Sequence, residues 1–151
     1  MRHEFSAAEL ASAPVIAAMP VLDALAALRL MRGNYIRHLP VVDDGRCVGL
    51  VSETDVLIAL ASTTRGPLPT VLELCRRPPP TVDSMSSRTE AARVMSQEAS
   101  DALVVIARDV VVGVLTAVDL VRSLAASTVE DDISEDVDDV EGDMRGDVPA
   151  R

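Results

Sequence analysis

The chain has 151 residues, 48% of them hydrophobic, which is enough to bury the core of one compact domain or of two small ones. Phe5 and Tyr35 are its sole aromatic residues, so base recognition by stacked aromatic side chains is hard to build. The net charge of −10 is concentrated in ten acidic residues between Glu130 and Asp147. An acidic segment repels phosphate backbones, so we expect no binding to nucleic acid.

Membrane and secretory segments are not indicated. No apolar stretch reaches the roughly 20 residues that span a bilayer, and acidic residues and prolines interrupt the N-terminal part, as at Glu4, Glu9 and Pro14. The two cysteines, Cys47 and Cys75, form neither a C-x-x-C motif nor a disulfide framework. We therefore expect a cytoplasmic protein that binds no membrane, with small buried or half-buried thiols.

In chain order, the first predicted element is an extended segment at 14–18, and a helix follows it. The helix is indicated by apolar residues at spacings of three and four. These residues are Val21, Leu22, Leu25, Leu28 and Met31. A β-branched run at 39–42, the hairpin turn Asp43-Asp44-Gly45 and a second apolar run then predict two strands. A second helix is predicted to begin at Ser52.

The same order returns after a proline-rich segment at 63–77, in which Thr70 caps a predicted short helix. The later elements are an extended segment at 80–82, a weaker helical pattern, a β-branched run at 103–107, a turn at 108–109 and a helix starting at Thr116. The weaker helical pattern consists of Ala91, Ala92, Val94 and Met95. Dense like charge predicts disorder for 130–151.

The two halves are an internal duplication. Residues 38–55 read HLPVVDDGRCVGLVSETD, and residues 102–119 read ALVVIARDVVVGVLTAVD. One offset of 64 residues aligns the halves without a gap. It pairs Pro14 with Pro78, Ala27 with Ala91, Met31 with Met95, Gly49 with Gly113, Ser52 with Thr116 and Asp55 with Asp119. Each β-α-β-β-α copy of about 50 residues buries too little surface alone, so we expect the two to pack together.

The string at 39–55, preceded by Ile36-Arg37-His38, resembles the signature of a cystathionine-β-synthase (CBS) domain. The resemblance covers about residues 8–126 and is closer in the first copy. It implies an α/β (α+β) fold of two tandem CBS repeats, a Bateman module, packed sheet to sheet with pseudo-two-fold symmetry, and frequently a homodimer. The expected division is an N-terminal arm at 1–8, CBS domains at 9–62 and 78–126, a linker at 63–77 and an acidic tail at 127–151.

The resemblance also implies two clefts between the repeats, which commonly hold AMP, ADP, ATP or S-adenosylmethionine. By position, Asp55 and Asp119 correspond to ribose ligands. Ser52 and Thr116 correspond to hydroxyls that contact ribose or phosphate at a helix N-terminus, where free N–H groups favour an anion. The backbone groups facing adenine would belong to Ile16, Ala17 and Ala18 in one site and to Pro80, Thr81 and Val82 in the other.

By the same resemblance, Arg37 corresponds to a basic residue that contacts phosphate, and His38 to an assisting residue. The offset of 64 puts Asp101 and Ala102 at these positions in the second copy. An acidic residue repels a polyphosphate. We therefore expect unequal sites, the better one built on Ser52, Asp55 and Arg37.

Simpler structural interpretations remain open. The S-x-x-D and T-x-x-D spacings are also those of helix capping boxes. Close strand packing explains Gly49 and Gly113 equally well. Arg37 fits as a surface residue or ion-pair partner, and His38 as a surface or edge residue. Tyr35 fits as a packing residue at a helix end, with adenine stacking as the alternative role.

We expect a regulatory module that binds an adenosine-containing ligand and modulates an unidentified partner protein by shifting the arrangement of its repeats. No catalytic constellation, metal-ligand cluster or P-loop is present, so we expect neither enzymatic activity nor a catalytic cofactor. The alternative is a structural dimerisation and interaction module with degenerate ligand sites, whose acidic tail docks on a partner.

Overall fold

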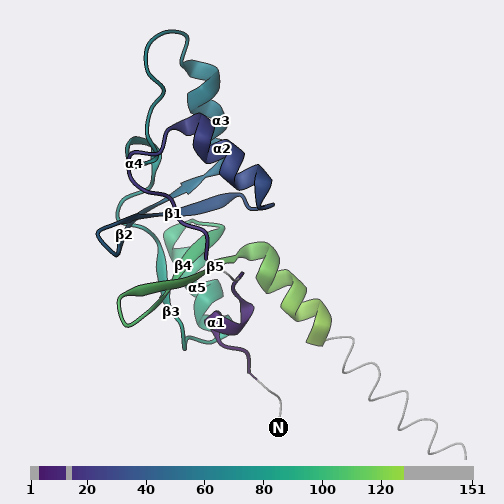
Figure 1. Cartoon of the computed structure of the whole chain (residues 1–151). Coiled ribbons are helices and arrows are strands. Elements are labelled where there is room, and N and C mark those ends of the chain that lie inside the picture. The colour runs from purple at the N-terminus through teal and green to yellow at the C-terminus, as the bar shows by residue number, and fades with distance from the viewer. Residues whose placement is uncertain (1–3, 13–14, 128–151) are drawn as a thin grey trace, which may run out of the picture.

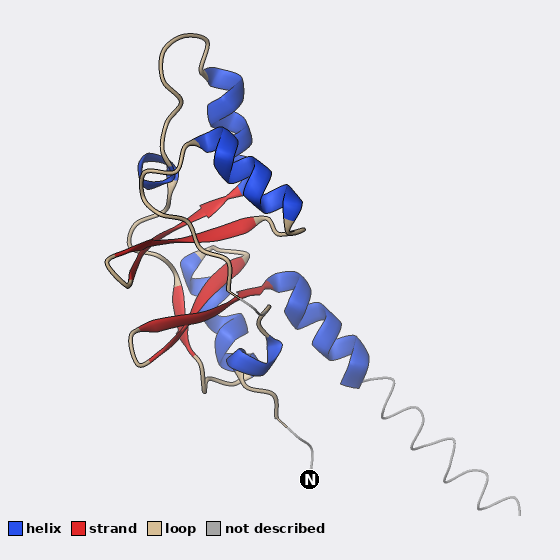
Figure 2. Cartoon of the chain, viewed as in Figure 1, coloured by secondary structure: helices blue, strands red, loops and turns tan. Residues whose placement is uncertain are grey.

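The computed structural model describes residues 4–12 and 15–127, which form two sheets with helices on their outer sides (Figures 1 and 2). The predicted mixed α/β class is confirmed. Pro14, the first residue of the predicted extended segment, lies outside the described residues. The acidic segment 130–151, for which disorder is predicted, lies outside them as well.

The first repeat contains an antiparallel hairpin between two helices. Its elements are α2 (Ala24–Gly33), β1 (His38–Asp43), β2 (Arg46–Ser52) and α3 (Glu53–Ser62). The predicted turn is confirmed, because Asp44 and Gly45 both have positive φ angles, 50° and 78°, as a two-residue hairpin turn requires. Over the described residues 15–18 of the segment expected before α2, no strand forms. Ala18 makes one parallel bridge to Val41 instead.

The second repeat has the full predicted order. Its elements are β3 (Thr81–Asp83), α5 (Arg88–Glu98), β4 (Ala102–Ala107), β5 (Val110–Thr116) and a helix over 117–127, the last described residues. Strand β3 runs parallel to β4, and β4 pairs antiparallel with β5. The turn at Arg108 and Asp109 has φ angles of 50° and 65°, so it repeats the geometry of the first hairpin.

The buried face of α2 differs from the predicted one. Val21 is 74% exposed, because the helix begins only after Asp23, whose side chain accepts the N–H of Ala26 at 2.9 Å. In the first long helix of each repeat, the buried residues are Ala24, Ala27 and Met31 of α2 and Ala91 and Met95 of α5. Alanine at the contact lets each helix approach its sheet closely. The buried pairs Ala27/Ala91 and Met31/Met95 keep the offset of 64 residues.

The two repeats pack sheet to sheet, as expected. Leu50 of β2 and Ala102 and Val104 of β4 form a buried cluster between the sheets. Each repeat has its own larger core between sheet and helices. Residues 4–12 and 15–127 therefore form three hydrophobic layers, and the middle one joins the repeats.

Two short helices are exchanged between the repeats. Helix α1 (Ala7–Leu10) packs on the second repeat, where Ala7 is fully buried and its N–H donates to the carbonyl of Ser86 at 2.8 Å. Helix α4 (Val71–Leu74) packs on the first repeat, where Val71 is fully buried. The cap predicted at Thr70 is confirmed. Helix α1 was not predicted, although Ser6 and Glu9 repeat the capping box of α4 at the same offset.

Gly49 and Gly113 lie where the exchanged segments cross the sheets. A Cβ atom on Gly49 would lie 2.3 Å from Cys75 Sγ, and one on Gly113 would lie 2.7 Å from Ala11 Cβ. Real carbon contacts are about 3.5–4.0 Å. Both glycines permit close packing, but the partner is the exchanged segment and not a neighbouring strand of the sheet.

Candidate ligand-binding cleft between the repeats

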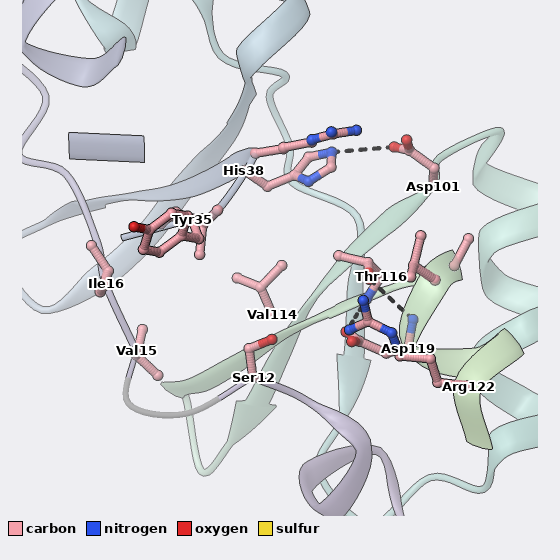
Figure 3. A pocket seen from close by; sticks show the side chains of 14 residues that line it. Ser12, Val15, Ile16, Tyr35, His38, Asp101, Val114, Thr116, Asp119 and Arg122 are labelled. Atoms are coloured by element: carbon pink, nitrogen blue, oxygen red, sulfur yellow. Dashed lines mark hydrogen bonds and ion pairs between the residues drawn. The ribbon is translucent and has the colours of Figure 1, made fainter. Parts of the chain in front are cut away.

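A cavity of about 470 Å³ lies between the two repeats (Figure 3). Small-molecule sites usually have volumes of roughly 300–1,000 Å³, so the cavity has the size of a ligand site. Both repeats contribute to its wall. The wall includes Ser12, Ile16, Tyr35, Arg37 and His38 from the N-terminal part, and Asp101, Val114, Thr116, Asp119 and Arg122 from the second repeat.

Thr116 and Asp119 both cap a helix and line the larger cavity. The Thr116 N–H donates to Asp119 Oδ2 at 2.9 Å, and the Asp119 N–H donates to Thr116 Oγ1 at 3.2 Å. This is a reciprocal capping box at the start of the 117–127 helix. Both residues also line the cavity, so the cap holds the carboxylate at the cavity wall.

Ser52 and Asp55 are placed differently. The Asp55 N–H donates to Ser52 Oγ at 3.1 Å, which caps α3. The Asp55 side chain is exposed and lines neither the larger cavity nor the smaller one beside Ser52. Ser52 lines a smaller cavity of about 240 Å³ together with Glu53 and Thr54. Ser52 and Arg37 therefore share the smaller cavity, as the expected grouping requires, but Asp55 does not line it. The larger cavity joins Arg37 to Asp119 of the other repeat.

Arg37, His38 and Asp101 line both cavities. His38 Nε2 donates to Asp101 Oδ1 at 3.2 Å, which links the start of β1 to the residue before β4. Arg37 and Asp101 are equivalent positions that the pseudo-symmetry brings together near its axis. The residues from which unequal phosphate binding was expected therefore line both cavities.

The extended segments expected to face adenine are only partly available. Ile16 lines the larger cavity, but the N–H and C=O of Ala18 are bonded to Pro40 and Val42 of β1 at 2.8 and 2.9 Å. Ala18 therefore has no free N–H for a ligand edge, and its carbonyl oxygen already accepts one hydrogen bond. Its neighbour Ala17 lies outside both cavities.

The corresponding residues of the second repeat are used by the sheet. Thr81 and Val82 pair with β4 as part of β3, and both lie outside the two cavities. The carbonyl of Pro80 accepts the N–H of Val104 at 2.9 Å. The expected adenine contacts of the second site are therefore not placed at either cavity.

Three cavity residues were missed or misread from sequence. Tyr35 is 96% exposed, so the interpretation as a packing residue is wrong. Arg122 was missed, although it lies three residues after Asp119 and hence one helical turn away. Ser12 reaches the cavity because its N–H donates to the carbonyl of Val114 at 3.2 Å, which depends on the exchange of α1.

The cysteines are half-buried, as expected. Burial raises the pKa of the Cys47 thiol and that of the Cys75 thiol. A raised thiol pKa leaves less thiolate at neutral pH, and the thiolate is the reactive form. Both thiols are therefore poor nucleophiles at neutral pH.

Over residues 4–12 and 15–127, no three or more His, Cys, Asp and Glu side chains are grouped closely enough to hold a metal ion. The same residues contain no helix that combines the length and the apolar character needed to cross a bilayer.

The architecture defines a class: a duplicated α/β module with exchanged terminal helices and a ligand-sized cavity between its repeats. A family model for the CBS domain matches the chain twice, at residues 7–62 and 71–126. The chain belongs to the CBS domain family and carries two CBS domains in tandem. The matched ranges include α1 and α4.

Solved CBS structures resemble this chain closely. The CBS domain pair of protein MJ0100, in complex with 5′-methylthioadenosine and S-adenosyl-L-methionine, is 25% identical with a TM-score of 0.74, over 83% of this chain and 99% of that chain. CBSX2 in complex with AMP is 25% identical to this chain with a TM-score of 0.69. The match covers 82% of this chain and 98% of that chain.

Hypoxic Response Protein I, whose structure contains two coordinated zinc ions, is 28% identical to this chain. Its TM-score is 0.68, over 78% of this chain and 98% of that chain. No curated protein sequence matches the chain significantly.

Proposed function

We propose that the chain is a regulatory, non-catalytic module that binds an adenosine-containing ligand in the cavity between its repeats and thereby modulates a partner protein. The observation that carries the proposal is the joining of Arg37 and Asp119, from different repeats, in one cavity of about 470 Å³. The adenosine ligands of the MJ0100 and CBSX2 CBS pairs support the ligand class.

The charges of the cavity support a definite orientation of such a ligand. Asp119 caps its own helix through Oδ2, and its carboxylate is a natural acceptor for the two ribose hydroxyls. Arg37 and Arg122 supply positive charge for phosphate from opposite repeats. The adenine then lies toward Ile16.

Regulation follows from the position of the cavity. A ligand that contacts both repeats binds best to one arrangement of the two, and so raises the population of that arrangement. The His38–Asp101 hydrogen bond joins the same two repeats across the cavity. An anionic ligand that binds Arg37 and His38 would compete with Asp101 for them.

Isothermal calorimetry with AMP, ADP, ATP and S-adenosylmethionine tests the proposal. We expect at least one of them to bind with a Kd in the micromolar to millimolar range. Replacement of Arg37 by alanine should weaken a phosphate-bearing ligand about tenfold, because a charge-assisted hydrogen bond is lost. Arg108→Ala, on the distant β4–β5 turn, is the matched control. Failure of all four ligands to bind would contradict the proposal.

We also propose a homodimer, which is the assembly that the alternative structural function requires. Exposed apolar side chains follow both Ser/Thr–Asp caps at equivalent positions, since Leu57 of α3 corresponds to Val121 of the 117–127 helix. Ile58, Val118 and Leu124 extend these faces. Contiguous apolar patches on a soluble protein often mark an interface.

Sedimentation velocity tests the homodimer. The unchanged chain should sediment as a dimer, and the Leu57→Glu/Val121→Glu variant as a monomer, because a charge buried in an apolar interface is strongly unfavourable. Arg108→Glu, on the distant β4–β5 turn, is the control. A monomeric unchanged chain at micromolar concentration would exclude the dimer.

A further inference from the structure

Tyr35 is the aromatic side chain of the larger cavity, and it is 96% exposed. A ring so exposed adds almost nothing to the hydrophobic core. The core of the first repeat is made of aliphatic residues and Met31 instead. The ring therefore calls for an explanation other than packing.

The backbone at Tyr35 belongs to the repeated fold. Its φ angle of 56° lies in the left-handed region, which is uncommon for residues other than glycine. Ala99, the equivalent residue after α5, has a φ angle of 50°. Because alanine supports the same turn, the aromatic ring is not needed to form it. The two repeats thus differ in the side chain that this turn presents.

The ring lies at one end of the cavity. In Figure 3, Tyr35 and Ile16 lie on one side, and Thr116, Asp119 and Arg122 lie on the other. A nucleoside whose ribose is held by Asp119 therefore extends its base toward Tyr35 and Ile16. Aromatic and aliphatic side chains are the groups that cover the flat faces of a base.

We propose that Tyr35 stacks on the nucleobase of the bound ligand and makes the larger cavity selective for ligands that carry a base. This rests on the function proposed above and adds the group that reads the base. The inequality of the two repeats then originates at the base end, where Tyr35 corresponds to Ala99, and not at Arg37 and Asp101, which line both cavities.

The composition provides a direct probe. The chain has one tyrosine and no tryptophan, so its intrinsic tyrosine fluorescence comes from Tyr35 alone. We expect AMP to quench this fluorescence with the same Kd that calorimetry gives, and ribose 5-phosphate, which lacks a base, to leave it unchanged. N-acetyltyrosinamide titrated with the same AMP solutions corrects for light absorbed by the nucleotide.

Two variants separate stacking from structure. Tyr35→Ala should raise the Kd for AMP about 5- to 30-fold, because one base–aromatic stacking contact is lost. Tyr35→Phe, which keeps the ring, should bind AMP like the unchanged chain. Both should melt at the temperature of the unchanged chain, since the side chain is exposed.

The outcomes distinguish this inference from the function on which it rests. AMP binding with an unchanged Kd in Tyr35→Ala and no quenching would overturn the role of Tyr35 and leave the ligand site intact. Fluorescence that changes with protein concentration and not with AMP would assign the ring to a contact between copies, and would also overturn it. If AMP does not bind at millimolar concentration, both the binding of AMP in the cavity and the stacking of Tyr35 on its base are contradicted.

Discussion

Replacing Asp119 with alanine should raise the Kd for AMP about 100-fold or more, whereas replacing Asp55 with alanine should leave it nearly unchanged. Each hydrogen bond to a charged group contributes about 1.5–3 kcal/mol, and Asp119 would lose two such bonds to ribose. Asp119 lines the cavity that contains Arg37, and Asp55 lies outside it. Calorimetric titration of both variants with AMP measures the difference.

Asp55→Ala is a matched control because both aspartates occupy the third position of a helix whose cap is Ser52 or Thr116. Asp119 also accepts the Thr116 N–H, so its loss should destabilise the 117–127 helix by about 1 kcal/mol. Thermal melting of each ligand-free variant accounts for that effect. Equal loss of AMP binding in the two variants, or a larger loss in Asp55→Ala, would reject the assignment of the site.

Gly113→Ala should destabilise the folded chain by about 1–3 kcal/mol, although it adds a single methyl group. The new Cβ would lie 2.7 Å from Ala11 Cβ and 3.3 Å from the carbonyl oxygen of Ser12. Neither neighbour can rotate away, because one is a methyl carbon on the backbone and the other is backbone. Urea unfolding followed by circular dichroism measures the loss, and we expect a lower midpoint with a similar slope.

Two further variants show whether the exchanged segment is the cause. Ala11→Gly removes the methyl group opposite Gly113, so the double variant should recover at least about 1 kcal/mol relative to the sum of the single effects. Gly33→Ala in α2 is the control, since no atom lies within 4 Å of its added Cβ, and it should be neutral or stabilising. Strictly additive effects of Ala11→Gly and Gly113→Ala would contradict the packing argument.

Much of the fold follows from local patterns. The β-hairpin turns, the Thr70 cap and the buried Met31 and Met95 were predictable because each depends on neighbours in sequence or on the offset of 64. The strand expected before α2 was not predictable in the same way. Its formation depends on how many residues of that segment reach β1, and Ala18 alone makes a bridge.

The individual residues of the site were predictable from the sequence, but the way they group into cavities was not. Arg37, His38, Ile16, Thr116 and Asp119 were all identified from sequence and share one cavity. The larger cavity does not follow the assignment by repeat, because it combines Arg37 of the first repeat with Asp119 of the second, whereas the smaller cavity keeps Arg37 with Ser52. No pattern within a single repeat carries that information. Arg122 and the exposure of Tyr35 become apparent only when both repeats are in place.

The exchange of α1 and α4 also determines when the protein can fold. The core of the first repeat is incomplete until Val71 is available, and the core of the second includes Ala7 together with Leu115. Neither repeat can complete its core during synthesis from its own residues alone, and the second core closes a chain loop of more than a hundred residues. Such distant contacts slow folding. The two CBS domains should therefore unfold together, in one cooperative transition, and gain their stability as a single unit.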